Sequence, residues 1–515
     1  MKKKLLSVIL CLGMFGSLLS GCSGNTSGQS TAAPENTQGG QDSAEASGSE
    51  TEAATEGGYT EVEKVILYTP FIGNNEDKDN VVEAINAITR TEIGVELQWE
   101  QFDIGQWFQQ YSLFLSGTDD IDILFNFGGI STAVAQGAAL DITDIVEEYG
   151  QGIKEVLGQY IVNGEVGGRL YGLAPFTTYG SAYGINYRKD IVRELGLEDV
   201  VAQVKTLDDW TPVLAAVKEA YPEMTPFVTA TGSTMYNFFY GDWDNLGNGI
   251  GVLLDGGADT KVTNLFETDL YRELCTTMNE WYKAGYSSMD IQTQTDSYSL
   301  LCSQGIAFST ITNQDFNSEF RVSSETAQEI GSIQLGEPFA KTYTDALYTV
   351  MANSKHPEAA VRFLNMMYTD KRILDMMSYG IEDVHYQVTE DGRLDYMDGQ
   401  DASTCTYHDQ MAACANQVLR TLWATENPEY PTGIVEVNNT CKQSKALGFV
   451  FDSTPVQNQV TEIENILGKY RNGLECGALD VEENLDKFND ELKSAGIEDV
   501  IAEKQRQLDE WLANK

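Results

Sequence analysis

The residues that most often carry out catalysis or bind metals do not occur here at the spacings this chemistry needs. The sequence contains no GxSxG, Walker or HExxH motif. The Asp242-x-Asp244 pair begins like a calcium loop, but Leu246 takes the third ligand place and Leu253 the twelfth. The histidines stand apart from one another, none at metal-ligand spacing: His356, His385 and His408. We therefore expect no catalytic site, cofactor or metal.

The cysteines give no redox or zinc motif. Beyond Cys11 and Cys22, the remaining ones are spread without a CxxC spacing: Cys275, Cys302, Cys405, Cys414, Cys441 and Cys476. An exported protein permits disulfides, and the pair Cys405 with Cys414 is one candidate among the alternative pairings.

A different chemistry is offered by aromatic and polar residues that stand close together. Tyr236, Tyr240, Asp242 and Trp243 form such a cluster, in which rings can stack on the apolar face of a ligand and a carboxylate can accept its hydroxyl hydrogens. Core packing is the alternative for the tyrosines. Trp243 lies between two acids, which favours a ligand platform.

The N-terminus predicts export and lipid attachment. Residues 1–22 combine a basic start, a short apolar run and the tetrad Leu19-Ser20-Gly21-Cys22, which resembles the bacterial lipobox. We expect diacylation of Cys22; an uncleaved membrane anchor is the alternative, disfavoured because the run is short. Residues 23–57 are small and polar and predict a disordered tether.

Charge and length restrict the partners and the architecture. The formal charge is −45, from 78 Asp+Glu against 33 Lys+Arg, which argues against nucleic acid and disfavours anionic ligands. The chain has 515 residues, 42% of them hydrophobic, enough for two or three domains with their own cores.

The folded part is predicted to form two successive α/β lobes. Short β-rich runs alternate with amphipathic helical periods, first in a βαβ pattern that predicts parallel strands and then again further along. The C-terminal tail from residue 460 is helical. The predicted strands are 65–68, 95–99, 121–125, 183–187, 227–230, 305–310 and 343–351, and the predicted helices are 79–89, 106–116, 206–220, 265–283 and 357–367.

Several runs of residues, in order, resemble the extracellular solute-binding proteins of ABC importers. They comprise 116–125 (SGTDDIDILF), 170–175 (LYGLAP) with 183–190 (YGINYRKD), 206–210 (TLDDW), 305–310 (GIAFST) and 351–360 (MANSKHPEAA). The resemblance spans residue 65 to about residue 386, some two thirds of the chain. Runs at 379–386, 448–452 and 501–511 resemble the LipO-like sugar-binding lipoproteins of Gram-positive gut bacteria.

The resemblance implies the fold class α/β, of the periplasmic-binding-protein-like type II, with two lobes around a hinge and a ligand cleft between them. It places lobe 1 at 58–176 and 340–400, and lobe 2 at 177–339 and 401–515 with a helical C-terminal extension. It also implies a monomer, lipid-anchored on the extracellular face of the cell membrane, that binds a carbohydrate and delivers it to ABC transporter permease subunits.

By the same resemblance, ligand contacts should come from strand ends and from the hinge. The residues so implied are Phe71, Asn126, Phe127, Thr178, Tyr179 and Thr310, in addition to the aromatic cluster. Most other tryptophans are expected to pack in cores or on helices: Trp99, Trp107, Trp210, Trp281 and Trp511. A peptide or other small solute remains an alternative ligand, and a surface polysaccharide-degrading enzyme an alternative function.

Overall fold

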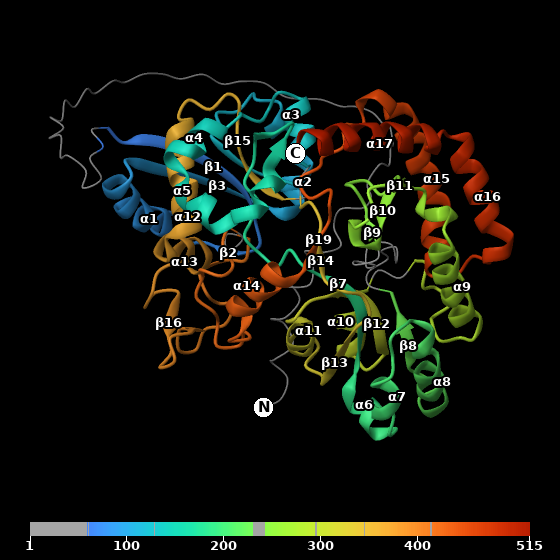
Figure 1. Ribbon diagram of the computed structural model, residues 1–515. Helices are drawn as coiled ribbons and strands as arrows, with labels where there is room; N and C mark the ends of the chain where they lie inside the picture. Colours follow the sequence, from blue (N-terminus) through green and yellow to red (C-terminus); the bar gives the residue numbers. More distant parts are fainter. Residues whose placement is uncertain are drawn as a thin grey trace, which may run out of the picture.

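The computed structural model describes residues 59, 61–127, 129–229, 243–293, 296–343, 346–411 and 415–515. Within them the chain forms two α/β lobes joined by several crossing segments, with a group of C-terminal helices beside the second lobe (Figure 1). Each lobe has its own mixed sheet and its own hydrophobic core. The predicted fold class is confirmed.

The first lobe is built on a sheet with the strand order β15-β4-β1-β3. β1, β3 and β4 run parallel, as the βαβ pattern predicts, whereas β15 returns from later in the chain and pairs antiparallel with β4. All four residues of β4 are buried, as expected for a strand inside the sheet. The elements are β1 (Glu63–Phe71), α1 (Lys78–Glu92), β3 (Val95–Asp103), α2 (Ile104–Leu115), β4 (Ile123–Asn126), α3 (Ile130–Ala135), α4 (Thr143–Tyr149), α5 (Gln151–Leu157), β15 (Leu347–Val350), α12 (Pro357–Thr369) and α13 (Lys371–Tyr379).

One buried amide fixes helix α1 against the sheet. The side chain of Asn86 accepts a hydrogen bond from the Leu97 N–H at 2.7 Å and donates one to the Leu97 carbonyl at 3.0 Å. Asn86 lies on the same buried helix face as Val81 and Ile85. Both polar groups of the amide are thus satisfied inside the core, so its burial carries little cost.

The second lobe is also built on a four-stranded mixed sheet, with the strand order β13-β7-β12-β8. β12 runs parallel to β8 and antiparallel to β7. The predicted helix at 206–220 begins instead as a short 3-10 turn, Asp208–Trp210, followed by α8. The elements are β7 (Ala182–Arg188), α6 (Lys189–Glu194), α8 (Thr211–Ala220), β8 (Thr225–Val228), α9 (Asp269–Lys283), α10 (Tyr298–Ser303), β12 (Ala307–Gln314), α11 (Ser318–Thr326) and β13 (Ile330–Gln334).

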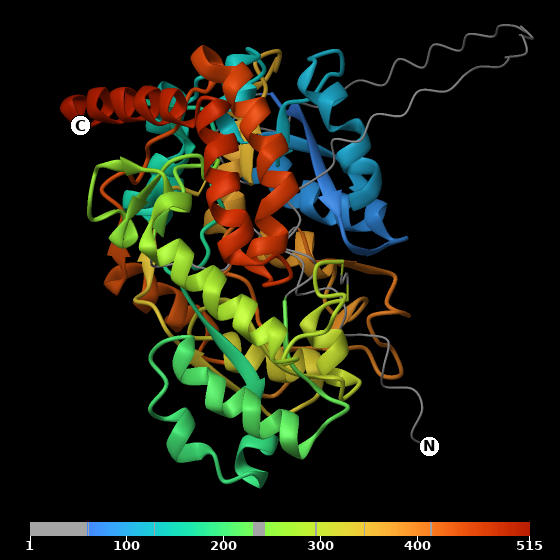
Figure 2. The same ribbon diagram turned by 90° about the vertical axis from the view of Figure 1, so that its right-hand side faces the viewer.

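The C-terminal helices extend the second lobe's core. Helices α15 (Gln457–Glu475), α16 (Val481–Ser494) and α17 (Ile497–Asn514) contribute buried side chains to it, and α17 also covers the small sheet of β9 (Trp243–Asp244), β10 (Val252–Leu254) and β11 (Val262–Thr263). Figure 2 shows α15 and α16 side by side, and Figure 1 shows α17 running from them toward the first lobe. The predicted helical extension is therefore part of the fold.

One segment lies in a different lobe from the one we expected. We placed 401–515 with the second lobe, but β18 (Tyr407–Asp409) pairs antiparallel with β2 (Gly73–Asn75) of the first lobe. Tyr407 and Met411 are buried in the first lobe's core, and the Tyr407 hydroxyl donates to the Met377 carbonyl at 2.7 Å. The first lobe thus continues past residue 400, because burial of these side chains in its core stabilises the segment there.

The lobes are connected through short strands and helix α14 (Tyr430–Thr440). β14 (Phe339–Ala340) pairs parallel with β19 (Lys442–Gln443), and isolated bridges join Phe176 to Asn416 and Ser181 to Phe339. The chain therefore passes between the lobes in several places that lie close together, which is the arrangement of a hinge.

Candidate functional site

The parallel strands of the first lobe end at one edge of the sheet. β1 ends at Phe71, β3 at Asp103 and β4 at Asn126, and Phe71 and Asp103 are paired in register. In open α/β sheets, ligands bind outside the carboxyl ends of the strands. We call this edge the first carboxyl edge and take it as one half of the candidate site.

Three residues implied by the family resemblance lie at the first carboxyl edge. Phe71 and Phe127 are half-buried, and Asn126 is fully buried with its side-chain oxygen accepting a hydrogen bond from the Tyr111 hydroxyl. The Phe127 ring lies 5.0 Å from Phe125, edge to face, and 5.7 Å from Phe108. The structure therefore places Phe71, Asn126 and Phe127 at the same edge of the sheet.

At the hinge, the side chain of Tyr179 is buried among other side chains. Its side chain is 7% exposed, and its ring stacks on Tyr160 with centroids 4.2 Å apart. Its hydroxyl donates to the Pro175 carbonyl at 2.6 Å, and burial holds the pKa of this phenol well above its ordinary value. The neighbouring Thr178 is half-buried. We expected Tyr179 to face a ligand; the structure packs it within the hinge.

Thr310 lies inside β12 and not at its end. The strand continues to Gln314, and Thr310 is 1% exposed and paired with Asn186 of β7. At the carboxyl end of β12, the Gln314 amide donates to the Asn186 side-chain oxygen at 2.9 Å, and Ser332 donates to the same oxygen at 2.7 Å. The carboxyl end of β12 therefore lies four residues beyond the expected position.

Of the aromatic cluster, the structure describes Trp243. Tyr236, Tyr240 and Asp242 lie outside the described residues. Trp243, which we expected to be a platform, is 3% exposed and belongs to the second lobe's hydrophobic core. Its two acidic neighbours do not prevent burial, because Asp244 is itself buried in β9 with one carboxylate oxygen accepting the Leu246 N–H.

Two exposed rings near strand ends were missed by sequence reasoning. Phe108 on α2 is 44% exposed, and Phe316, just after β12, is 36% exposed and lies 5.9 Å from Tyr430 of α14. A signal for Phe108 was present: Trp107 and Phe108 are adjacent on a helix, about 100° apart, so only one of them can face the core. The structure buries Trp107 completely.

The side chains of His385 and His408 are buried within the fold. His385 accepts the Ile381 N–H at 2.9 Å and contacts Asp77 at 3.0 Å, and burial lowers its pKa. Burial also lowers the pKa of His408, to about 4. Among the described residues, no group of His, Cys, Asp and Glu could hold a metal ion.

The expected pairing of Cys405 with Cys414 finds no support. Cys405 is a free, buried thiol that donates to the Tyr407 carbonyl at 3.1 Å, and Cys414 lies outside the described residues. The other described cysteines are free as well: Cys275, Cys302, Cys441 and Cys476.

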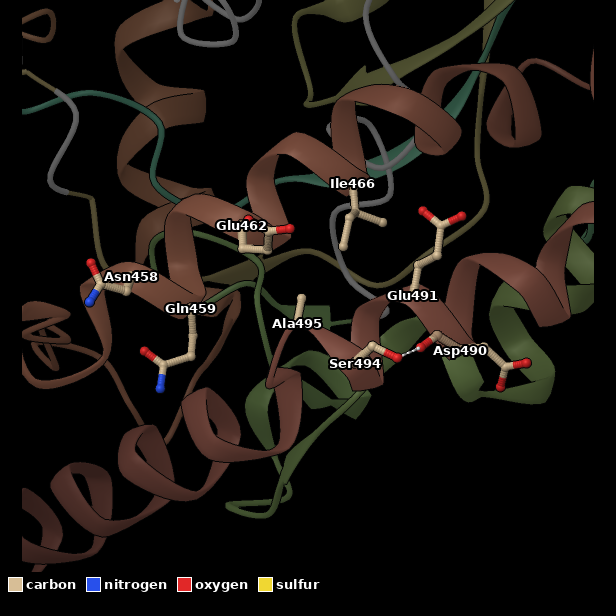
Figure 3. A pocket seen from close by; sticks show the side chains of 8 residues that line it. All are labelled: Asn458, Gln459, Glu462, Ile466, Asp490, Glu491, Ser494 and Ala495. Carbon is tan, nitrogen blue, oxygen red and sulfur yellow. Dashed lines mark hydrogen bonds between the residues drawn. The ribbon is translucent and has the colours of Figure 1, made fainter.

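A surface cavity of about 570 Å³ lies between α15 and α16 (Figure 3). Ile466 contributes its only large apolar side chain, and Ser494 donates to the Asp490 carbonyl within its wall. Its lining residues are Asn458, Gln459, Glu462, Ile466, Asp490, Glu491, Ser494 and Ala495. They offer neither an aromatic platform nor a cation, so this cavity is not the candidate site.

Residues 74–372 match the family described as bacterial extracellular solute-binding proteins. The chain belongs to this family. Residues 445–513 also match a domain of unknown function (DUF3502), which corresponds to the C-terminal helices and the segment before them. Within the described residues, no helix is both long and apolar enough to cross a bilayer.

Individual relatives agree with the family. A "Carbohydrate ABC transporter substrate-binding protein" of Streptococcus pneumoniae serotype 4 is 26% identical over 473 residues, which cover 88% of this chain and 92% of the relative. The crystal structure of the N-glycan transport solute binding protein NgtS from Streptococcus pneumoniae has a TM-score of 0.77 at 22% identity, covering 88% of this chain and 99% of NgtS. An extracellular solute-binding protein from Bifidobacterium longum subsp. infantis has a TM-score of 0.61 at 16% identity, covering 89% and 99%.

These comparisons confirm the family and the type II fold that the sequence motifs predicted. The chain is accordingly a solute-binding protein of an extracellular family and not an enzyme. The carboxyl edges of the two sheets and the hinge between them are then the parts of the structure from which ligand contacts are expected.

Proposed function

We propose that this protein captures an oligosaccharide outside the cell and delivers it to the permease of an ABC transporter. One observation carries the proposal: the relationship, along 88% of the chain, to a carbohydrate ABC transporter substrate-binding protein. NgtS has also been crystallised with Man1GlcNAc and with Man5GlcNAc, which supports a ligand of several sugar units.

The chemistry of the candidate site agrees with a sugar ligand. Sugars present apolar C–H faces that stack on aromatic rings, and hydroxyls that need amide, carboxylate or backbone partners. The first carboxyl edge offers the rings of Phe71 and Phe127 and the carboxylate of Asp103. A peptide would need fixed charges of both signs for its two termini. The last residues of β1, β3 and β4 are Phe71, Asp103 and Asn126, which supply an acid but no Lys or Arg.

In this proposal the protein is attached to the membrane through Cys22, and residues 23–57 form the tether. A chain held at the membrane surface meets its permease at a high effective concentration. Ligand would favour a closed arrangement of the lobes because it contacts both of them only in that state, and the permease would recognise that state. We further propose that the protein acts as a monomer.

A thermal-shift screen of residues 58–515 tests the function. Neutral oligosaccharides, acidic oligosaccharides, peptides and amino acids are compared at saturating concentration. A ligand at 100 times its Kd adds about 2.7 kcal/mol to the free energy of unfolding. We expect one or more oligosaccharides to raise Tm and to be recovered intact. A rise in Tm with peptides alone, or cleavage of the sugar, would overturn the proposal.

A further inference from the structure

Helix α2 presents an exposed aromatic ring beside the first carboxyl edge. It begins directly after β3, so its first turn stands at the end of that strand. Phe108 is 44% exposed, and its ring centroid lies 5.7 Å from that of Phe127, which directly follows β4. Phe127 packs in turn against the buried Phe125. The two outer rings are thus held in place from the sheet.

The exposure of Phe108 differs from that of an isolated surface hydrophobe. Leu113 on the same helix is 52% exposed, but it points about 140° away around the helix axis. Single exposed apolar side chains of that kind are common on protein surfaces. Phe108 instead adjoins a second ring at the edge where ligands of this fold class bind.

The segment around Phe108 is free of charge. Residues 104–118 contain no Asp, Glu, Lys or Arg, although the chain as a whole has 78 acidic and 33 basic residues. Its exposed side chains are amides, hydroxyls and apolar groups: Gln106, Phe108, Gln109, Ser112, Leu113, Ser116 and Thr118. Asp103, exposed at the start of the helix, adds a carboxylate whose Oδ1 accepts the Gly105 N–H at 2.9 Å.

This surface complements an uncharged polyhydroxylated ligand. The rings of Phe108 and Phe127 match the C–H face of a sugar, and the hydroxyl of Ser112, one helical turn after Phe108 on the same side of α2, can hydrogen-bond with the sugar hydroxyls. No charged group on the ligand is required. A uronic or sialic acid would find no cation in the segment and would be repelled by Asp103 and by the negative charge of the whole chain.

We propose that Phe108 and Phe127 form a platform for the apolar face of a neutral sugar unit, so that the site selects uncharged oligosaccharides over those carrying carboxylates. The inference rests on the proposed function and adds to it both a class of substrate and Phe108 as a specificity-determining residue.

The test uses residues 58–515 and calorimetric titration. Neutral probes are Man5GlcNAc and oligosaccharides of glucose, galactose and fructose, and the acidic probe is an alginate oligosaccharide of similar length. The neutral probe that binds tightest is then titrated into Phe108→Ala, Phe108→Tyr and Leu113→Ala. Unfolding without ligand is measured for each variant, and we expect little change because both replaced side chains are exposed.

We expect the neutral probe to bind more tightly than alginate. Phe108→Ala should weaken its binding on the order of 10-fold, Phe108→Tyr should retain affinity within about 3-fold, and Leu113→Ala should match the wild type. Tighter binding of alginate, or an unchanged Kd for Phe108→Ala, overturns this inference and leaves the proposed function standing. Failure of every oligosaccharide to bind the wild type overturns both.

Discussion

The side-chain oxygen of Asn438 accepts a hydrogen bond from the backbone N–H of Tyr179 at 2.8 Å. The same amide donates to the Thr177 carbonyl at 2.7 Å, and the Asn438 carbonyl accepts from the Tyr160 hydroxyl at 2.7 Å. Helix α14 is thereby fastened to the first crossing between the lobes. Asn438 is 3% exposed, so these bonds are made away from water.

Replacing Asn438 should loosen the hinge. In Asn438→Ala the buried Tyr179 N–H loses its partner, and we expect the free energy of unfolding to fall by about 1–3 kcal/mol. Asn438→Asp keeps the acceptor for the Tyr179 N–H but loses the donor to the Thr177 carbonyl. Its free energy of unfolding should therefore differ from that of the alanine variant. Urea unfolding measures both, with the exposed Asn439→Ala as the matched control. Equal stabilities of the two alanine variants would refute this role.

Lys504 should make the stability depend on pH. It is fully buried on α17, where its ammonium donates to the Asn248 side-chain oxygen at 2.6 Å and the Gly251 carbonyl at 3.2 Å. Burial lowers its pKa from 10.5 to about 7, and the carboxylate of Asp244 opposes the shift. Between these two pKa values the unfolded chain binds more protons than the folded one, so stability rises with pH by up to about 1.4 kcal/mol per pH unit.

This dependence can be isolated with Lys504→Met. We expect the wild type to gain stability relative to the variant as pH rises from about 7 toward 10, and the difference to level off below that range, where the amine is protonated in both states. Urea unfolding at a series of pH values gives the difference, with Lys487→Met, an exposed position on α16, as the control. Parallel curves for the wild type and Lys504→Met would contradict the prediction.

The cysteines should differ in their reactivity. Cys441 is half-buried, whereas Cys275, Cys302, Cys405 and Cys476 are buried, and burial raises the pKa of each of these thiols. Alkylation of the folded protein, followed by peptide mass spectrometry, should therefore modify Cys441 ahead of the other four. In urea without reductant all of them should react. A described cysteine that resists there would indicate a disulfide.

Cys22 should hold the protein at the membrane. In a bacterial host that lipidates such signals, Cys22→Ser should move the protein from the membrane fraction to the soluble one, because the acyl chains supply the attachment. Cys11→Ser, within the same apolar run, should leave the fractionation unchanged. Continued membrane association of Cys22→Ser would favour the uncleaved anchor.

Local patterns were enough to predict most elements. The expected helix 79–89 lies within α1, and the expected strand 95–99 within β3, because amphipathic periodicity shows directly which face of such an element is buried. The boundaries were less accurate: β12 starts and ends later than the run 305–310 suggested, which is why Thr310 was placed at a strand end.

Tertiary contacts determine which individual aromatic side chains are buried and which are exposed. Trp243 between two acids had the local signature of an exposed ring, yet it is buried because the C-terminal helices help to close the same core around it. Phe108 sits next to Trp107 on a helix predicted from sequence, but which of the two rings faces the core depends on the strands beneath.

The order of most strands and helices and the two-lobe family fold could be predicted from the sequence, because residue types and short-range spacing show which segments form each element. The packing of 401–411 against the first lobe, the burial of Tyr179 and the set of residues at the first carboxyl edge could not be predicted in this way. The reason is that these contacts join distant parts of the chain: Tyr179 and Asn438 are 259 residues apart. No local pattern encodes such a pairing, because it forms only when both lobes and the segments between them have folded.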